Sequence, residues 1–186
     1  MLREQPVLNV LLVNIMLGTV WHYLTFFLCR FLSPKIFFDP KRRMFKEHKW
    51  EKGGRIYNDA LKINKWKDML PQHIDKDGFS KSHLDDLSVR YLDEFIMETC
   101  RAEWNHTMNC FFAFVLFALN DPAMAALLTI FLIVGNLPFA VIQRYNRFRL
   151  QRLKRTVVRK QERKKDHSPK TAVSADDNDN ETETVA

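Results

Sequence analysis

Two groups of polar residues in this chain place side chains suited to acid–base chemistry at a helical spacing. The first group extends from residue 98 to residue 106, and the second from residue 143 to residue 149. Glu103 and His106 lie one helical turn apart, and a carboxylate that orients an imidazole makes a general base. Such a dyad could take the proton from a hydroxyl group.

Arginines in the same two groups could bind an anionic ligand. A guanidinium group holds a phosphate or a carboxylate by paired hydrogen bonds, and it could equally anchor to lipid head groups. A structural network of ion pairs between the two groups is the alternative that the sequence leaves open. The arginines concerned are Arg101, Arg144 and Arg147.

Other catalytic schemes fit the sequence less well. No histidine is followed by the aspartate of the glycerolipid acyltransferase box, and no Gly-x-Ser-x-Gly elbow, Walker loop or GxGxxG motif occurs. Glu103 and His106 have the spacing used by di-iron bundles, but no second copy supplies the remaining ligands. We therefore predict no metal. The three cysteines have no metal-binding spacing and are expected to be reduced packing residues: Cys29, Cys100 and Cys110.

Two apolar runs position the polar groups. Met108 to Leu119 and Ala123 to Ile142 are joined by Asn120-Asp121-Pro122, which predicts a helical hairpin through a membrane. The polar groups at its two ends must then lie on the same face of the bilayer and close together. The first arm spans a bilayer only if residues 104–107 are included, so a tilted or re-entrant hairpin is an alternative. We expect Gly135, in the second arm, to serve helix packing.

An amino-terminal run, Val7 to Phe31, is long enough to cross the hydrocarbon region. No small-x-small cleavage site follows it, so a retained anchor is favoured over a signal peptide. Lys and Arg gather after this run and after residue 143, whereas the turn at 120–122 has none. The positive-inside rule therefore predicts a multi-pass protein of the cell membrane, with its amino terminus outside and its carboxyl terminus in the cytoplasm.

Three further segments lie outside the apolar runs. Residues 56–69 predict a basic amphipathic helix that either lies in the membrane interface or packs on the other cytoplasmic helix. Ser82 begins a helix-start motif, after which an amphipathic helix runs toward His106. Residues 150–165 predict a basic helix that touches lipid or protein, and the acidic tail beyond them has almost nothing to bury.

These observations predict an all-α integral membrane protein. The net charge is +7, but the basic residues cluster beside apolar runs, so anionic lipid rather than nucleic acid is the expected partner. The predicted segments are a transmembrane anchor (1–31), a cytoplasmic or interfacial helical segment (32–103), a transmembrane hairpin (104–142), a basic cytoplasmic helix (143–165) and a disordered acidic tail (166–186).

Several short motifs together resemble the glycosyl-4,4'-diaponeurosporenoate acyltransferase family, over roughly residues 7–155. Phe148 and Cys100 depart from the pattern expected for the family. The motifs are Lys65-Trp66-Lys67 with Leu70, His83-Leu84, Glu98-Thr99-x-Arg101-Ala102-Glu103-x-x-His106, and Gln143-Arg144-Tyr145-Asn146-Arg147-x-Arg149-Leu150.

The resemblance implies transfer of a fatty acyl chain to a sugar hydroxyl of a carotenoid glycoside dissolved in the membrane. An acyl donor such as acyl-CoA would be the co-substrate, without a bound cofactor. His106 would be the base, oriented by Glu103 or Glu98. The residues expected to bind the substrate or the donor are Arg101, Arg144, Asn146, Arg147, Gln143, Lys65 and Trp66.

Two other functions remain open at this point. One is a non-catalytic membrane scaffold that holds other pigment-pathway enzymes together, with the polar groups as its binding surface. The other is an acyltransferase that acts on a different membrane glycolipid.

Overall fold

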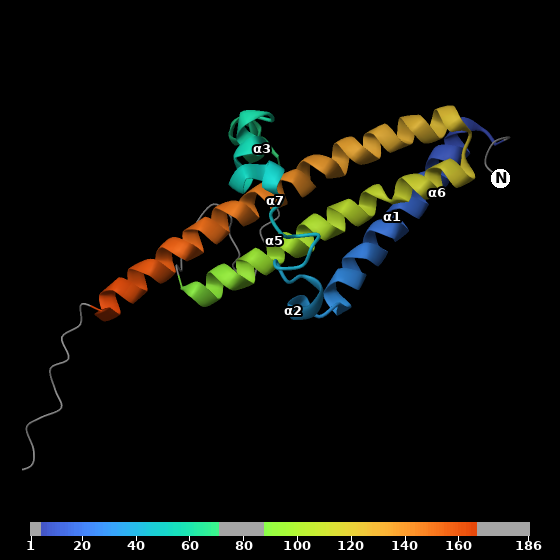
Figure 1. Cartoon of the computed structure of the whole chain (residues 1–186). Helices are drawn as coiled ribbons and strands as arrows, with labels where there is room; N and C mark the ends of the chain where they lie inside the picture. The colour runs from blue at the N-terminus through green and yellow to red at the C-terminus, as the bar shows by residue number, and fades with distance from the viewer. Residues whose placement is uncertain (1–4, 71–87, 167–186) are drawn as a thin grey trace, which may run out of the picture.

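The computed structural model describes residues 5–70 and 88–166, and every regular element in these two ranges is a helix (Figure 1). The prediction of an all-α protein is therefore confirmed. Two of the helices, α1 and α7, are long and apolar enough to cross a membrane. In chain order the elements are α1 (Val7–Phe31), α2 (Pro34–Phe37), η2 (Lys49–Gly54), α3 (Arg55–Asp59), α4 (Ile63–Trp66), η3 (Lys67–Met69), α5 (Val89–Cys110), α6 (Phe112–Leu119) and α7 (Pro122–Asp166).

The predicted hairpin is formed by α5 and α6 on one side and α7 on the other (Figure 1). The carboxylate of Asp121 caps the start of α7, because its Oδ1 accepts hydrogen bonds of 3.1 Å from the backbone N–H groups of Ala123 and Met124. Helix α6 has only eight residues, so the end of α5 must supply the rest of the first arm. Helix α7 has 45 residues and is about 68 Å long.

Most large apolar side chains on α1 and on the first half of α7 face outward. Ile15, Phe131 and Val134, for example, are 65%, 68% and 66% exposed. Soluble proteins rarely expose a continuous apolar surface of this kind, whereas lipid solvates it well. Gly135 belongs to this outward surface, since a Cβ added there would meet nothing within 4 Å. The expectation that Gly135 serves helix packing is therefore wrong.

Beyond the apolar runs, α5 and α7 continue side by side. Leu92, Phe95 and Ile96 of α5 bury themselves against Leu150 of α7, so the basic helix predicted at 150–165 is the continuation of α7 and contacts protein. Helix α5 begins after Ser88, whose hydroxyl accepts a hydrogen bond from a backbone N–H in the first turn. The predicted start at Ser82 lies outside the described residues, as does the acidic tail after Asp166.

The segment from Ile56 to Met69 is not the single helix that its pattern predicts. The backbone of Lys62 has a φ of 51°, which interrupts the helical path and separates α3 from α4. Tyr57 and Ile63 from this broken segment pack against Tyr145 and Phe148 of α7, among others. The segment therefore packs on protein, and the helix that it contacts in this cluster is α7.

Candidate functional site

The two polar groups predicted to meet are in direct contact. Arg144 and Arg147, near the middle of α7, both donate hydrogen bonds to the carboxylate of Glu103 on α5, with 2.9 Å between Arg144 Nη1 and Glu103 Oε1. The ends of the hairpin thus lie together, as the U-turn of the chain requires. The prediction that these groups share one location is confirmed.

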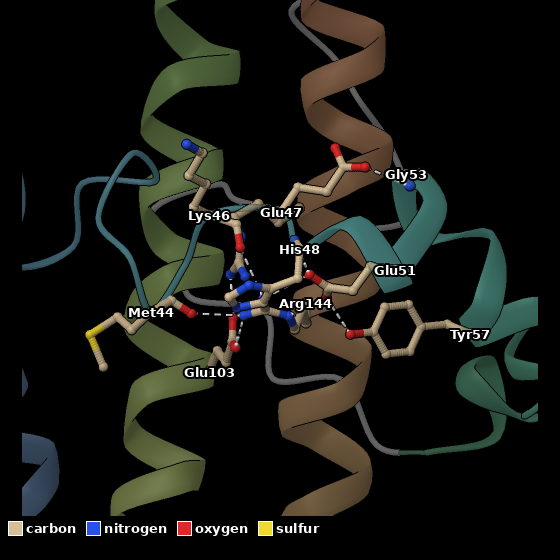
Figure 2. A network of polar contacts seen from close by, with 10 residues as sticks. Met44, Lys46, Glu47, His48, Glu51, Gly53, Tyr57, Glu103 and Arg144 are labelled. Atoms are coloured by element: carbon tan, nitrogen blue, oxygen red, sulfur yellow. Dashed lines mark hydrogen bonds and ion pairs between the residues drawn. The ribbon is translucent and has the colours of Figure 1, made fainter.

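Arg144 is the centre of this contact (Figure 2). Its Nε and Nη2 hold the two carboxylate oxygens of Glu51 at 2.5 and 3.0 Å, and its Nη1 reaches Glu103. The remaining bonds go to backbone carbonyl oxygens, from Nη1 to Met44 at 2.9 Å and from Nη2 to Lys46 at 3.1 Å. A guanidinium group has five N–H donors, and protein acceptors use all five. In this arrangement Arg144 has no donor left for a phosphate.

Glu51 is the residue that Arg144 binds most extensively, and it is fully buried. Its carboxylate also accepts hydrogen bonds from Tyr57 Oη at 2.6 Å and from the backbone N–H of His48 at 2.7 Å. Burial acts to raise the pKa of Glu51, but the hydrogen bonds from Arg144, Tyr57 and His48 outweigh it and hold that pKa below its ordinary value. Burial lowers the pKa of Arg144, and its bonds to Glu51 and Glu103 reverse that effect and raise it. Both groups are therefore charged at neutral pH.

Arg147 has no exposed surface. Its guanidinium carbon lies 5.4 Å from the ring centre of Phe45 and 5.8 Å from that of Phe148. Its Nε and Nη2 have no hydrogen-bond partner among the described residues. We refer to Glu51, Glu103, Arg144 and Arg147 as the ion-pair cluster. It contains two positive and two negative charges, so its charge is internally balanced.

Arg101 and Glu98 form a separate pair on α5, at 2.6 Å. The guanidinium carbon of Arg101 lies 5.7 Å from the ring centre of Phe38, which belongs to a buried group with Cys29 and Cys100. Burial raises the pKa of the Cys100 thiol. All three cysteines of the chain are free, as predicted.

The other residues predicted to bind substrate are spread over two surfaces. Gln143 is buried on α7, and its Oε1 has no hydrogen-bond partner among the described residues, whereas Asn146 is half-buried. Lys65 is exposed at the far side of the broken segment. Trp66 is half-buried there and donates its Nε1–H to the carbonyl oxygen of Leu61 at 2.8 Å. The structure therefore does not bring Lys65 and Trp66 into the ion-pair cluster.

His106 lies one turn closer to the α6–α7 turn than Glu103 and contacts α7. Its Nδ1 is 3.2 Å from Oδ1 of Asn136, and its ring stacks on Phe139 with 5.2 Å between ring centres. Asn136 Nδ2 donates to the backbone carbonyl of Leu132 at 3.0 Å, which directs Oδ1 toward the histidine. An amide thus contacts Nδ1 of His106, while the carboxylate of Glu103 holds two arginines. The orientation of His106 by Glu103 or Glu98 stays a prediction.

Sequence reasoning did not find Glu51 or Asn136 as site residues. Glu51 lies 93 positions from Arg144 in the short charged helix η2, where nothing in the local pattern separates it from surface carboxylates. Asn136 did carry a signal, because a side-chain amide within an apolar run of membrane length needs a polar partner.

Comparison with known proteins bears on the same residues. The family model described as glycosyl-4,4'-diaponeurosporenoate acyltransferase matches residues 41–156, which include the ion-pair cluster, His106 and Asn136. The chain belongs to this family. The proteins of that name from Staphylococcus aureus strains Newman and MRSA252 are 32% and 29% identical over 133 and 132 residues, covering 70% of this chain and 79% of each relative. No solved structure matches the chain.

Membership of this family makes the chain an acyltransferase. The exposed apolar surfaces of α1 and α7 agree with association with a membrane. The match begins at residue 41, so it does not include α1.

Proposed function

We propose that this acyltransferase esterifies a sugar hydroxyl of a membrane-dissolved carotenoid glycoside with a fatty acyl chain. The acyl donor would be a thioester such as acyl-CoA, and no bound cofactor is required by this chemistry. The proposal is supported by the name of the Staphylococcus relatives and by a candidate base that contacts the apolar part of α7. An amphiphilic acceptor and a fatty acyl chain would both reach such a site from the lipid.

The contact between His106 and Asn136 carries the proposal. Because Oδ1 of Asn136 is an acceptor, Nδ1 of His106 is the nitrogen that carries the proton, and in the neutral ring the lone pair is on Nε2. Nε2 would take the proton of the sugar hydroxyl as its oxygen attacks the acyl carbonyl carbon. The carbon–sulfur bond then breaks, the ester bond remains, and the proton passes from Nε2 to the leaving thiolate.

The ion-pair cluster has a positioning role in this proposal. All five N–H groups of Arg144 are bound by protein acceptors, and Arg147 is fully buried. Neither guanidinium group is therefore placed to bind the acyl donor. The cluster instead joins η2, which carries Glu51, to both arms of the hairpin. The predicted contacts of Gln143, Asn146, Lys65 and Trp66 with the acyl donor or the acceptor remain part of the proposal. Gln143 supports it, because its buried Oε1 has no partner within residues 5–70 and 88–166.

The same proposal orients the chain in the cell membrane. The start of α1 lies at the end of the molecule that carries the α6–α7 turn, and the end of α7 lies at the other (Figure 1). Asn14 of α1 and Asn120 of the turn bond to each other through both amides, at 2.8 and 2.9 Å. We place this end outside and the ion-pair cluster at the inner membrane surface, where the positive-inside rule puts the Lys and Arg residues.

The decisive experiment compares His106→Ala with the wild type, purified in detergent and supplied with a fatty acyl thioester and a glycosylated carotenoid. Removal of a general base lowers kcat by about 10²- to 10⁴-fold, so a loss in that range is expected. Thr107→Ala is the matched control, because Thr107 is exposed and its hydroxyl bonds only to the backbone of its own helix. Wild-type turnover by His106→Ala would eliminate His106 as the base. Absence of ester product with the wild-type enzyme would refute the proposed acceptor.

A further inference from the structure

Polar side chains from three helices meet among the apolar runs. His22 and Thr25 come from α1, Asn109 from α5 and Asn136 from α7. Asn136 lies eight residues before Arg144, about 12 Å along α7 toward the turn. Polar groups among apolar helices are costly to bury. This cluster contains His22 and contacts His106, so it calls for a functional explanation.

The direction of each hydrogen bond follows from one fixed amide. Since Nδ2 of Asn136 donates to the Leu132 carbonyl, its Oδ1 is an acceptor, and Asn109 Nδ2 approaches that Oδ1 at 3.4 Å. Oγ1 of Thr25 lies 2.8 Å from Oδ1 of Asn109 and 2.9 Å from the carbonyl oxygen of His22, so its single proton can go to either, and the contact with Asn136 is what sets the Asn109 amide. Nδ2 of Asn109 is then the donor to Nδ1 of His22, at 3.0 Å.

The two histidines therefore have opposite tautomers. His22 accepts at Nδ1, so its neutral ring carries the proton on Nε2, whereas His106 donates at Nδ1 and has its lone pair on Nε2. His22 is exposed on α1 and His106 is half-buried, so both rings border the surface that lipid covers. Nε2 of His22 is therefore a hydrogen-bond donor, whereas Nε2 of His106 is a base.

We propose that His22 is a second catalytic residue of the acyl transfer and that its Nε2–H donates to the oxygen of the acyl carbonyl. As the sugar hydroxyl gives its proton to His106 and its oxygen bonds to the carbonyl carbon, negative charge develops on the carbonyl oxygen, and a preorganised donor stabilises it. The charge returns to the carbon–oxygen double bond when the thiolate leaves. Asn109, oriented by Asn136, is the positioning residue that fixes the tautomer of His22.

This inference rests on the proposed function and adds a helix to it. The family match covers α5, α6 and most of α7 but not α1, so His22 is assigned by the geometry alone. It also explains why α1 contributes side chains to the hairpin at this depth rather than only apolar surface. The amino-terminal helix becomes part of the active site instead of a simple anchor.

The test uses two variants of the full-length enzyme that have similar side-chain volumes. His22→Gln keeps an N–H donor, whereas His22→Met keeps only the volume. Loss of one oxyanion donor lowers kcat by about 10²- to 10³-fold, so we expect a decrease in this range for His22→Met. The kcat of His22→Gln should be at least about tenfold higher than that of His22→Met. Leu24→Met, at a neighbouring exposed position on α1, should retain wild-type kcat. Equal kcat values for the Met and Gln variants, or wild-type turnover by the Met variant, would overturn the role of His22.

A second measurement does not depend on the stability of the variants. In ¹⁵N NMR of the histidine-labelled wild-type enzyme, His22 should carry its proton on Nε2 and His106 on Nδ1, and the reverse tautomer at His22 would refute the inference. The two proposals fail in different ways. If His106→Ala is inactive while His22→Met retains full activity, only the proposed role of His22 is refuted. If the wild-type enzyme forms no ester, the proposed function itself is refuted.

Discussion

Neutralising Glu51 tests the structure most directly, because this carboxylate is buried and accepts four hydrogen bonds. Two come from Arg144, one from Tyr57 and one from the backbone of His48. Glu51→Gln keeps the shape of the side chain but removes its charge. One carboxylate oxygen becomes an NH2 group, which faces the N–H and O–H groups that donate to Glu51 in the wild type. Arg144 then keeps its charge in a site where Glu103 alone remains to compensate it.

The expected cost follows from the burial of the pair. Removing one partner of a buried ion pair destabilises a protein by about 3–5 kcal/mol, since the other charge is left uncompensated. For a chain of this length each kcal/mol lowers Tm by about 2–4 °C, so Glu51→Gln should lower Tm by roughly 6–20 °C. Glu47→Gln is the matched control. Glu47 is exposed and accepts a hydrogen bond from the backbone of Gly53, which a Gln oxygen can also accept.

Thermal unfolding in detergent at several pH values is the assay. A carboxyl group whose pKa is lowered in the folded state contributes stability at pH values above its unfolded pKa, here 4.5, and loses it as the pH falls through the folded pKa. The wild-type Tm should therefore fall in acid below about pH 4.5, and this component should be missing from Glu51→Gln. Similar Tm values for Glu51→Gln and Glu47→Gln at neutral pH would refute the account of the ion-pair cluster.

Two further predictions concern packing. At Gly54, whose φ is +84°, an added Cβ would lie 2.9 Å from Cδ2 of Phe148. Gly54→Ala should therefore destabilise the fold by about 1–3 kcal/mol in the same thermal assay, and an unchanged Tm would contradict the contact. Asn14→Leu removes the donor to the buried Oδ1 of Asn120, whose Nδ2 keeps only its bond to the Leu116 carbonyl, and should cost about 1–3 kcal/mol. A double variant with Leu at both positions should recover part of that loss. Additive losses in the double variant would show that the two amides do not interact.

The long apolar helices could be predicted because few backbone structures other than a helix satisfy their own polar groups in lipid. The apolar run predicted at residues 7–31 coincides with α1, and the turn at 120–122 lies where α6 gives way to α7. Once the hairpin is accepted, the proximity of the polar groups at 98–106 and 143–149 follows from the return of the chain to the same side. These predictions depended on long segments and on a strong physical constraint, not on side-chain detail.

The partners of individual polar groups could not be predicted. Periodicity placed Glu103 near His106 on one helix, but it gave no information about the arginines that cross from α7 or about the amide of Asn136. Glu51 was missed because its importance comes from burial by segments distant in sequence. The break at Lys62 was missed for a related reason, since the packing of Tyr57 and Ile63 on α7 overrides a helical pattern.

The ion-pair cluster and the contact of His106 with Asn136 both lie in the interface between α5 and α7. Asn136 and Arg147 are eleven residues apart, which is close to three full turns, so they lie on nearly the same face of α7. The bond from Arg147 to Glu103 and the contact of Asn136 with His106 are therefore set by one rotation of α7 about its axis. A substitution that frees this rotation would misplace Asn136 and, through Asn109, the ring of His22. Arg144 and Arg147 can thus support turnover by fixing this geometry, without touching the acyl donor.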